Sequence, residues 1–261
     1  MNRPRIVRLV LVAAMVACTM PRPAASQERG EAQANYLHAV GLDQDALALE
    51  QILLEGLQIH KPFLLAAHQE GMARYFAFVM TVSGLNAGMA QHLEKKGIDL
   101  IHAITADTRP FNEQALMADL VVVGDVIAVV ETPEPDDGFR SSIVVEAQTV
   151  LKGEAPSDTL FIRQRSGLSG DKAPEDTSRD LHPEAVERYL FLLSNGMYRF
   201  FVASRDEAMA PMPEPVQAQH FVIYRSYPMD DDRLLWNRFS RRDTKRAFKQ
   251  IRKLDRLMTE F

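Results

Sequence analysis

The stretch Leu120–Val130, which reads LVVVGDVIAVV, decides the fold class of this 261-residue chain. β-Branched residues dominate it, as they do in β-strands. Gly124 interrupts the run, as happens where a strand bends sharply at the corner of a barrel. We therefore expect a bent strand here, paired with strands that follow it in the chain.

Further strands are expected on the C-terminal side of this stretch. Ser142–Leu151 and Thr159–Arg165 alternate apolar and polar side chains, and this period of two predicts strands. Gln219–Arg225 predicts a last short strand beyond a linker that contains three prolines. The strand count favours an antiparallel β-barrel of the OB type over residues 112–226.

A closing hairpin is expected around Asn195-Gly196. This dipeptide is the most typical two-residue hairpin turn, because a type I′ turn needs positive φ at both central residues. Tyr189–Leu193 and Tyr198–Val202 flank it and have the composition of strands. We predict that these two segments pair with each other.

Three of these segments carry a resemblance to a known family. Ala118–Gly124, Val150–Gly153 and Glu187–Leu192 resemble the pattern ADLVVVG…VLKG…GERYLLFL of a group of exported bacterial proteins. That group is similar in fold to the netrin-like module of tissue inhibitors of metalloproteinases. The resemblance covers about residues 112–203 and implies an OB-type barrel. It does not imply protease inhibition, because the chain lacks the zinc-chelating Cys-x-Cys element of those inhibitors.

Residues 36–104 predict a helical block, which makes the expected fold class α+β. Asp43–Leu57 has leucines and an alanine at helical spacing, and a second helical stretch over residues 63–96 should break near Gly71 or Gly84. Tyr75–Leu93 contains no charged residue, so a membrane helix and a buried core helix are both considered. The polar residues in its second half favour the core helix.

The first 26 residues predict a secretory signal peptide. Three arginines precede the apolar run Leu9–Ala17, which is too short to span a bilayer. Small residues place the cleavage site after Ser26, so that Gln27 would begin the mature chain. Cys18, the only cysteine, lies in a degraded lipobox and leaves open a lipid-anchored envelope protein. Either way we expect an exported protein, periplasmic or secreted.

The last block, residues 233–261, predicts a basic amphipathic helix. It carries 10 basic and 3 acidic residues (+7), whereas residues 27–232 carry 16 basic and 32 acidic (−16). Ser240 and Asp243 form a capping arrangement at its start. One side of the helix is apolar and the other is basic, the basic residues being Arg242, Arg246, Lys249, Lys253 and Arg256.

Three roles are open for this helix. Its apolar side would dock on the body of the protein with the basic side facing an acidic surface, or the helix would lie on an anionic membrane, or it would bind a partner protein. Docking is favoured, because the body is present at a high effective concentration. A body this acidic argues against nucleic acid as a partner.

The chemistry-bearing motifs predict no catalytic, cofactor or metal site. None of the three His-x-Glu pairs has the further ligands that zinc requires, and no P-loop or dinucleotide fingerprint is present. The expected function is therefore a non-enzymatic binding or interaction protein of the bacterial envelope. The alternative is a hydrolase-like enzyme whose dispersed histidines and carboxylates converge only in the fold, namely His182, Glu184, His220, Asp119, Asp125 and Glu131.

Overall fold

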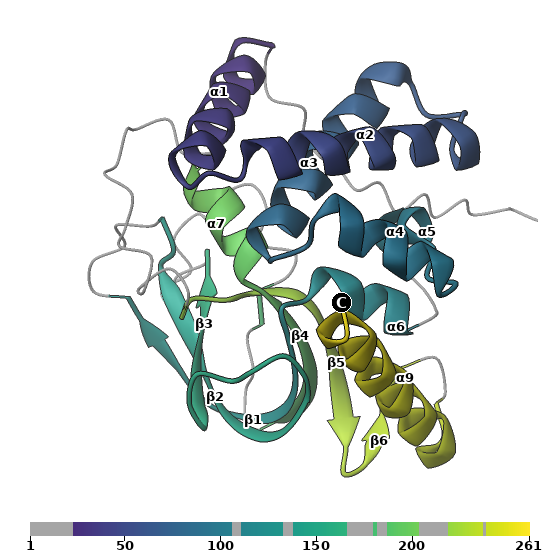
Figure 1. The fold of residues 1–261 in the computed structure, drawn as a ribbon. Coiled ribbons are helices and arrows are strands. Elements are labelled where there is room, and N and C mark those ends of the chain that lie inside the picture. The colour runs from purple at the N-terminus through teal and green to yellow at the C-terminus, as the bar shows by residue number, and fades with distance from the viewer. Residues whose placement is uncertain are drawn as a thin grey trace, which may run out of the picture.

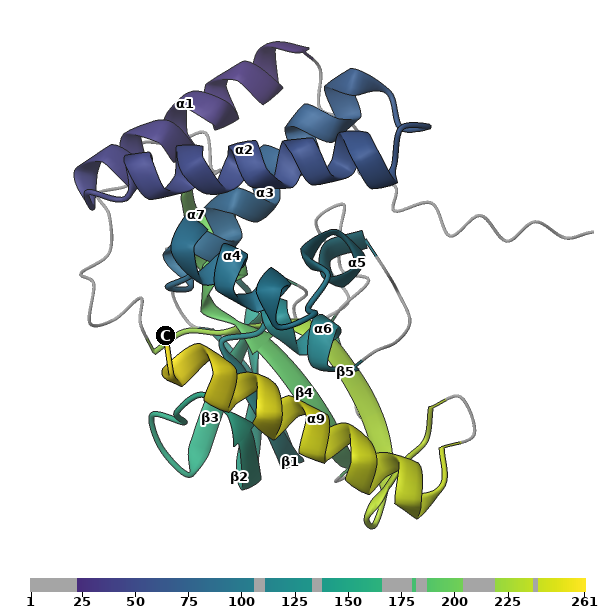
Figure 2. The same cartoon turned by 45° about the vertical axis from the view of Figure 1, so that its right-hand side comes forward.

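The computed structural model describes residues 23–105, 111–132, 138–165, 180–181, 187–203, 219–236 and 239–261. Over these ranges the protein is a mixed α/β structure, in which eight α-helices accompany an open antiparallel sheet of six strands (Figure 1). The N-terminal helices form a layer at one end of the sheet, and the C-terminal helix crosses the sheet itself (Figure 2). None of the described helices has the combination of length and apolar character that crossing a membrane requires.

The helical part follows the expected order, and the structure decides between the two positions expected for the break. The break falls at Gly84, whose φ of +84° suits glycine, whereas Gly71 lies inside a helix. The uncharged stretch Tyr75–Leu93 spans that break, and most of its apolar side chains are buried in the core. The helices before the sheet are α1 (Pro23–Ala39), α2 (Asp43–His60), α3 (Ala66–Val82), α4 (Ala87–Lys95), α5 (Leu100–Thr105), α6 (Phe111–Gln114) and the 3-10 turn η1 (Ala115–Met117).

The sheet has the order β3-β2-β1-β4-β5-β6, and all neighbouring strands are antiparallel. Its register shifts between Val123 and Gly124, where the bend was expected. A Cβ on Gly124 would lie 2.4 Å from Cγ1 of Val145, so only glycine fits there. The strands are β1 (Leu120–Glu131), β2 (Ser141–Lys152), β3 (Thr159–Gln164), β4 (Glu187–Ser194), β5 (Val222–Asp230) and β6 (Arg233–Leu234).

Apolar side chains are buried on both faces of the sheet. Val122 of β1 packs with Phe191 in a core inside the curved sheet. Val121 and Leu190 face the other way, into a larger core that the helices share. Because the first half of β1, up to Val126, is covered on both faces, its sequence there is a nearly continuous apolar run instead of an alternating one.

The hairpin prediction at Asn195-Gly196 is wrong. β4 ends at Ser194, and Asn195 begins helix α7 (Asn195–Ala203), so that Tyr198–Val202 is helical. The first backbone N–H groups of α7 have acceptors: Asn195 N and Gly196 N donate to Oδ2 of Asp119, at 2.6 and 3.2 Å. A carboxylate at a helix N-terminus satisfies free donors and favours the helix.

Glycine at position 196 has a packing reason. A Cβ there would lie 2.3 Å from the backbone oxygen of Val79, so α7 approaches α3 at a distance that only glycine allows. The strand that pairs with the end of β4 is β5, with Leu193 opposite Ile223. The structure therefore lacks the hairpin that we expected to close a netrin-like barrel.

The expected OB-type barrel is not confirmed, because the sheet is open. Its two ends nevertheless approach each other at one point. Ile162 of β3 forms an isolated parallel bridge with Phe221, and Arg163 N donates to Phe221 O at 2.8 Å.

Candidate functional site: the basic face of helix α9

Helix α9 (Arg241–Thr259) begins at a complete capping box. Asp243 N donates to the Ser240 hydroxyl at 3.2 Å, and Ser240 N donates to the Asp243 carboxylate at 3.1 Å. The helix start predicted from Ser240 and Asp243 is therefore confirmed. Thr244 ties the first turn to β6, because its hydroxyl accepts a hydrogen bond from Leu234 N at 3.1 Å.

The apolar side of α9 is buried in the shared core. Ala247, Ile251 and Leu254 are at most 3% exposed. Helical periodicity places them on one side of the helix. The predicted docking of this side on the body of the protein is confirmed. Burial of side chains such as Ile251 and Leu254 contributes about 1.5–3 kcal/mol each to holding the helix in place.

The C-terminal half of α9 is attached at two further points. The Asp255 carboxylate accepts a hydrogen bond at 3.0 Å from Gly153 N, immediately after β2. The Phe261 ring lies 5.5 Å from the His92 ring and fits against α4, where a Cβ on Gly88 would lie 3.0 Å from it. The helix is thus held along its whole length, and its outer side is presented as a rigid surface.

The exposed residues of that outer side are mainly basic, with the capping residue Asp243 at its N-terminal end. We call it the basic face and define it by the exposed residues Arg242, Lys245, Arg246, Lys249, Arg252, Lys253 and Arg256. It contains the five residues predicted from the sequence and two more, Lys245 and Arg252. The sequence analysis missed these two because it followed a single stripe, whereas the helical period places both beside that stripe.

The acidic residues of α9 form hydrogen bonds within the folded protein, whereas the basic-face residues form no ion pairs in the part of the chain described. Asp243 caps the helix and Asp255 binds Gly153 N. Arg241, outside the basic face, lies 3.8 Å from Asp231. Within the described ranges, none of the seven basic-face residues forms an ion pair. No ion pair of the described residues therefore supports the expectation that this side faces an acidic surface of the same chain, which stays a prediction.

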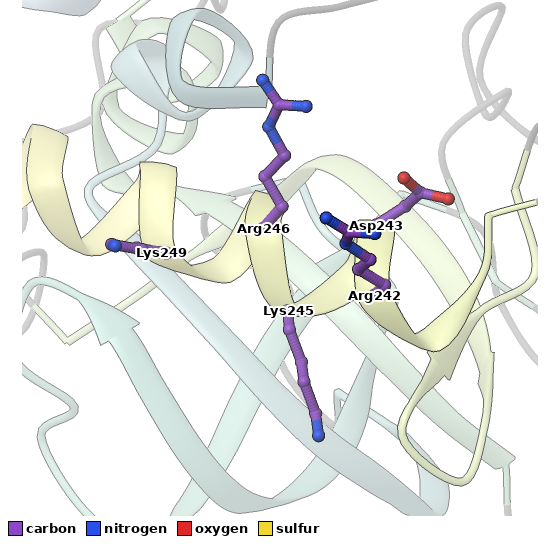
Figure 3. Close-up of a pocket in the computed structure, with 5 residues that line it drawn as sticks. All are labelled: Arg242, Asp243, Lys245, Arg246 and Lys249. Atoms are coloured by element: carbon purple, nitrogen blue, oxygen red, sulfur yellow. The ribbon is translucent and has the colours of Figure 1, made fainter.

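The basic face is convex. Figure 3 shows Arg246 and Lys245 pointing up and down across this face, with Lys249 pointing along a third direction. The shallow depressions between these side chains are lined by residues of α9, and within the described ranges no second element supplies an opposing wall. This geometry suits a broad anionic surface better than a small ligand, which binds in concave sites.

A second group of charges lies buried where β1, β2 and α7 meet. We call Asp119, Lys152 and the start of α7 the buried junction. The Lys152 ammonium donates to Ala118 O and lies close enough to Asp119 for their charges to interact. Burial raises the pKa of the Asp119 carboxyl, although Lys152 and the α7 N–H groups oppose this. Burial lowers the pKa of Lys152 to about 8, against the attraction of Asp119 and Asp255.

Among the remaining residues of the enzyme alternative, Asp125 and Glu131 have separate surroundings, whereas His220 adjoins the buried junction, where its backbone oxygen accepts a hydrogen bond at 2.7 Å from the Asn195 side chain. Asp125 forms a two-pronged ion pair with Arg188 on β4, at 2.7 and 2.8 Å, and the hydrogen bond from Arg188 lowers the pKa of Asp125. His220 Nδ1 lies 3.0 Å from the Tyr198 hydroxyl. Glu131 is exposed at the end of β1. His182 and Glu184 lie outside the described residues.

One titratable pair was not expected from the sequence. His102 Nδ1 contacts the Glu113 carboxylate between α5 and α6. No short-range spacing indicated this pair, because the two residues lie on different helices. Among the described residues, no group of three or more histidines, cysteines, aspartates or glutamates is placed to hold a metal ion.

The predicted processing sites lie at the edge of the described chain. Cys18 lies outside the described residues, and Ser26 and Gln27 fall in the first turns of α1. Cleavage after Ser26 would remove the first four residues of that helix.

The basic face is the site on which a functional argument must rest. Comparison of the chain with models of protein families, with curated proteins and with solved structures found no match.

Proposed function

We propose that this protein is an exported, non-enzymatic binding protein of the bacterial envelope that docks on an anionic phospholipid surface through the basic face of α9. One observation carries the proposal. Seven exposed cations lie on one side of a helix whose opposite side is fixed in the core, and none of them has an ionic partner among the described residues.

The composition of the basic face favours lipid over a protein partner. Protein interfaces have an apolar centre and are depleted of lysine, whereas this face has no apolar side chain among its cations. A bilayer needs no matching shape, and each lysine or arginine near an anionic surface contributes about 1 kcal/mol. Because the apolar side of α9 is already buried, contact through this helix is superficial and sensitive to salt.

The charge distribution also sets an orientation. Residues 27–232 carry a net charge of −16, and the block 233–261 carries +7. An anionic surface therefore repels most of the molecule and attracts α9, so the protein approaches with this helix first.

Vesicle binding by the full chain tests the proposal. Binding to phosphatidylcholine vesicles that contain phosphatidylglycerol should exceed binding to phosphatidylcholine alone, and should fall when salt rises from about 0.05 M to about 0.5 M. Arg246→Gln with Lys253→Gln should weaken binding roughly 30-fold, since two cations contribute about 2 kcal/mol.

The matched control is Arg74→Gln with Arg140→Gln, which removes the same charge from exposed positions outside α9. Equal losses from both double variants would overturn the proposal. So would binding to polyglutamate without a preference for phosphatidylglycerol, because that result indicates an acidic protein partner.

Export is proposed from the leader sequence and has its own test. The intact mass of the protein recovered from the envelope should correspond to a chain that begins at Gln27. A mass that retains residues 1–26 contradicts export by cleavage. Diacylation at Cys18 would instead select the lipid-anchored form, in which the membrane contact of α9 is held close to the bilayer.

We further propose that the sheet is a partly open OB-type barrel that serves as a rigid platform for α9. Support comes from the strand order β3-β2-β1-β4-β5, the parallel bridge between Ile162 and Phe221, and the separate core inside the curved sheet. Hydrogen exchange at the Arg163 amide should then be as slow as at the amides of β2. Fast exchange at Arg163 would show that the sheet stays open there.

A further inference from the structure

We infer that the connection between α2 and α3 is a second membrane contact, whose apolar tip inserts into the interfacial layer of the same anionic bilayer. The inference deepens the proposed function and rests on it for the identity of the surface. Its physical basis is separate, because it depends on exposed apolar side chains and not on the basic face.

The tip consists of three large apolar side chains that the fold leaves in water. Ile59 is 71% exposed, Phe63 is 75% exposed and Leu65 is 71% exposed. Ile59 lies in the last turn of α2, and Phe63 and Leu65 lie in the connection that follows; no other part of the described structure exposes three large apolar residues so closely in sequence. Figures 1 and 2 show the turn projecting from the end of the helical layer, away from the sheet.

The tip has a defined structure. Lys61 N donates to Leu57 O at 2.8 Å, and Leu64 N donates to Lys61 O at 3.1 Å. The buried Gln69 side chain donates to the same Lys61 oxygen at 2.9 Å. The apolar side chains are therefore held outward by a hydrogen-bonded turn, so that little ordering remains to be done on binding.

The charge around the tip fits anionic headgroups. No acidic residue occurs between Glu55 and Glu70, and Lys61 lies inside the turn with its ammonium 5.9 Å from the centre of the Phe63 ring. Lys61 is thus the only side chain with a formal charge at pH 7 between Glu55 and Glu70. Apolar and aromatic side chains beside a lysine are typical of segments that lie in the membrane interface.

The size of the tip argues against a second copy of the chain as the occupant. Three side chains offer far less than the roughly 800 Å² per partner of a stable protein interface. The position of the tip fits the membrane. In Figure 1 the turn and α9 lie on the right-hand side of the molecule, the side that comes forward in Figure 2.

A single-site fluorophore tests the inference. Cys18 is the only cysteine, so Cys18→Ser combined with Phe63→Cys allows one environment-sensitive label at the tip of the full chain. The matched control carries Leu47→Cys, an exposed apolar position on α2 (60% exposed) away from the turn. With phosphatidylglycerol-containing vesicles, the label at position 63 should shift to the blue and gain intensity, and the label at position 47 should not.

A second measurement uses unlabelled protein. Phe63→Ala with Leu65→Ala should weaken vesicle binding about 10-fold, because the substitutions remove apolar surface that would be buried in the bilayer. The salt dependence of binding should not change. Leu47→Ala should have no effect on binding. Because all three positions are exposed, the thermal midpoint of each variant should match that of the parent.

The outcomes separate this inference from the proposed function. If binding is salt-sensitive but the emission of the label at position 63 does not change, the inference that the tip inserts is wrong and the proposed role of α9 stands. If the label at position 63 shifts to the blue and Arg246→Gln with Lys253→Gln does not affect this shift, the proposed role of α9 is wrong and the insertion of the tip stands. A shift that appears without vesicles as protein concentration rises overturns the tip, because a second copy then covers it.

Discussion

Lys152 in the buried junction and Lys249 on the basic face show how the same type of side chain behaves in two different regions of the molecule. Lys152 is buried, lies beside Asp119 and donates to a backbone oxygen. Lys249 is exposed and has no ionic partner among the described residues. A buried charge without its partner is costly, whereas an exposed one costs little. Lys152 is thus bound to the fold, and Lys249 is available for a ligand.

The largest effect expected from this comparison is on stability at the buried junction. Asp119→Ala removes the acceptor of two α7 N–H groups and the nearer of the two carboxylates that attract Lys152, leaving only Asp255. We expect the free energy of unfolding to fall by about 3–5 kcal/mol in urea titrations. Asp125→Ala, which breaks a partly exposed pair on the same strand, should cost at most about 1 kcal/mol. Equal losses of unfolding free energy would show that the buried junction contributes no more to stability than the partly exposed pair.

The pH dependence of stability sharpens the same comparison. The pKa of Lys152 is lowered from 10.5 to about 8 in the folded protein, so the unfolded chain binds more protons between these values. Stability should therefore rise as pH increases from 8 to 10.5, by at most about 3 kcal/mol in total. Lys152→Met should remove that rise when urea titrations are repeated across this range. A rise that persists in the variant would assign it to other groups.

Two glycine substitutions separate close packing at the junction from helix propensity. In Gly196→Ala the new Cβ meets the Val79 oxygen at 2.3 Å, and we expect a loss of about 1–3 kcal/mol in unfolding free energy. Gly71→Ala has nothing within 4 Å and lies inside α3. It should stabilise the protein by about 0.5–1 kcal/mol. Thermal unfolding of both variants checks whether the two effects have opposite signs.

The sequence predicted the features that depend on neighbours along the chain. β1 with its bend at Gly124, the helical spacing of α2, and the capping box and two-sided pattern of α9 follow from local periodicity and capping. The hairpin failed for a nonlocal reason, since the acceptor that makes Asn195-Gly196 a helix start is Asp119, 76 residues earlier. The tip at Phe63 was also missed, because only the fold shows which apolar residues stay exposed.

In the candidate site too, some features could be predicted from local sequence and others depend on the tertiary structure. Five basic-face residues could be named from helical periodicity, because the charge pattern of a helix is local. Whether those charges meet acids of the same chain depends on how the body folds around α9. The structure shows that both acids of α9 have internal roles and that the basic face has none among the described residues. The exposure of Lys249 is therefore a property of the tertiary structure.

The last expected effect, similar in size to that of Gly71→Ala, is the one most specific to α9. Lys249 has four like-charged neighbours at helical spacings of three and four residues, namely Lys245, Arg246, Arg252 and Lys253. Each such pair destabilises a helix by about 0.2–0.5 kcal/mol at low salt. Lys249→Gln should therefore raise the free energy of unfolding by about 1 kcal/mol while weakening binding to phosphatidylglycerol-containing vesicles, and the stability gain should vanish as salt screens the repulsion. Opposite changes in stability and binding from one substitution are expected only of a charge that the fold tolerates and the ligand uses. A loss of stability in Lys249→Gln would show that the basic face has an internal partner.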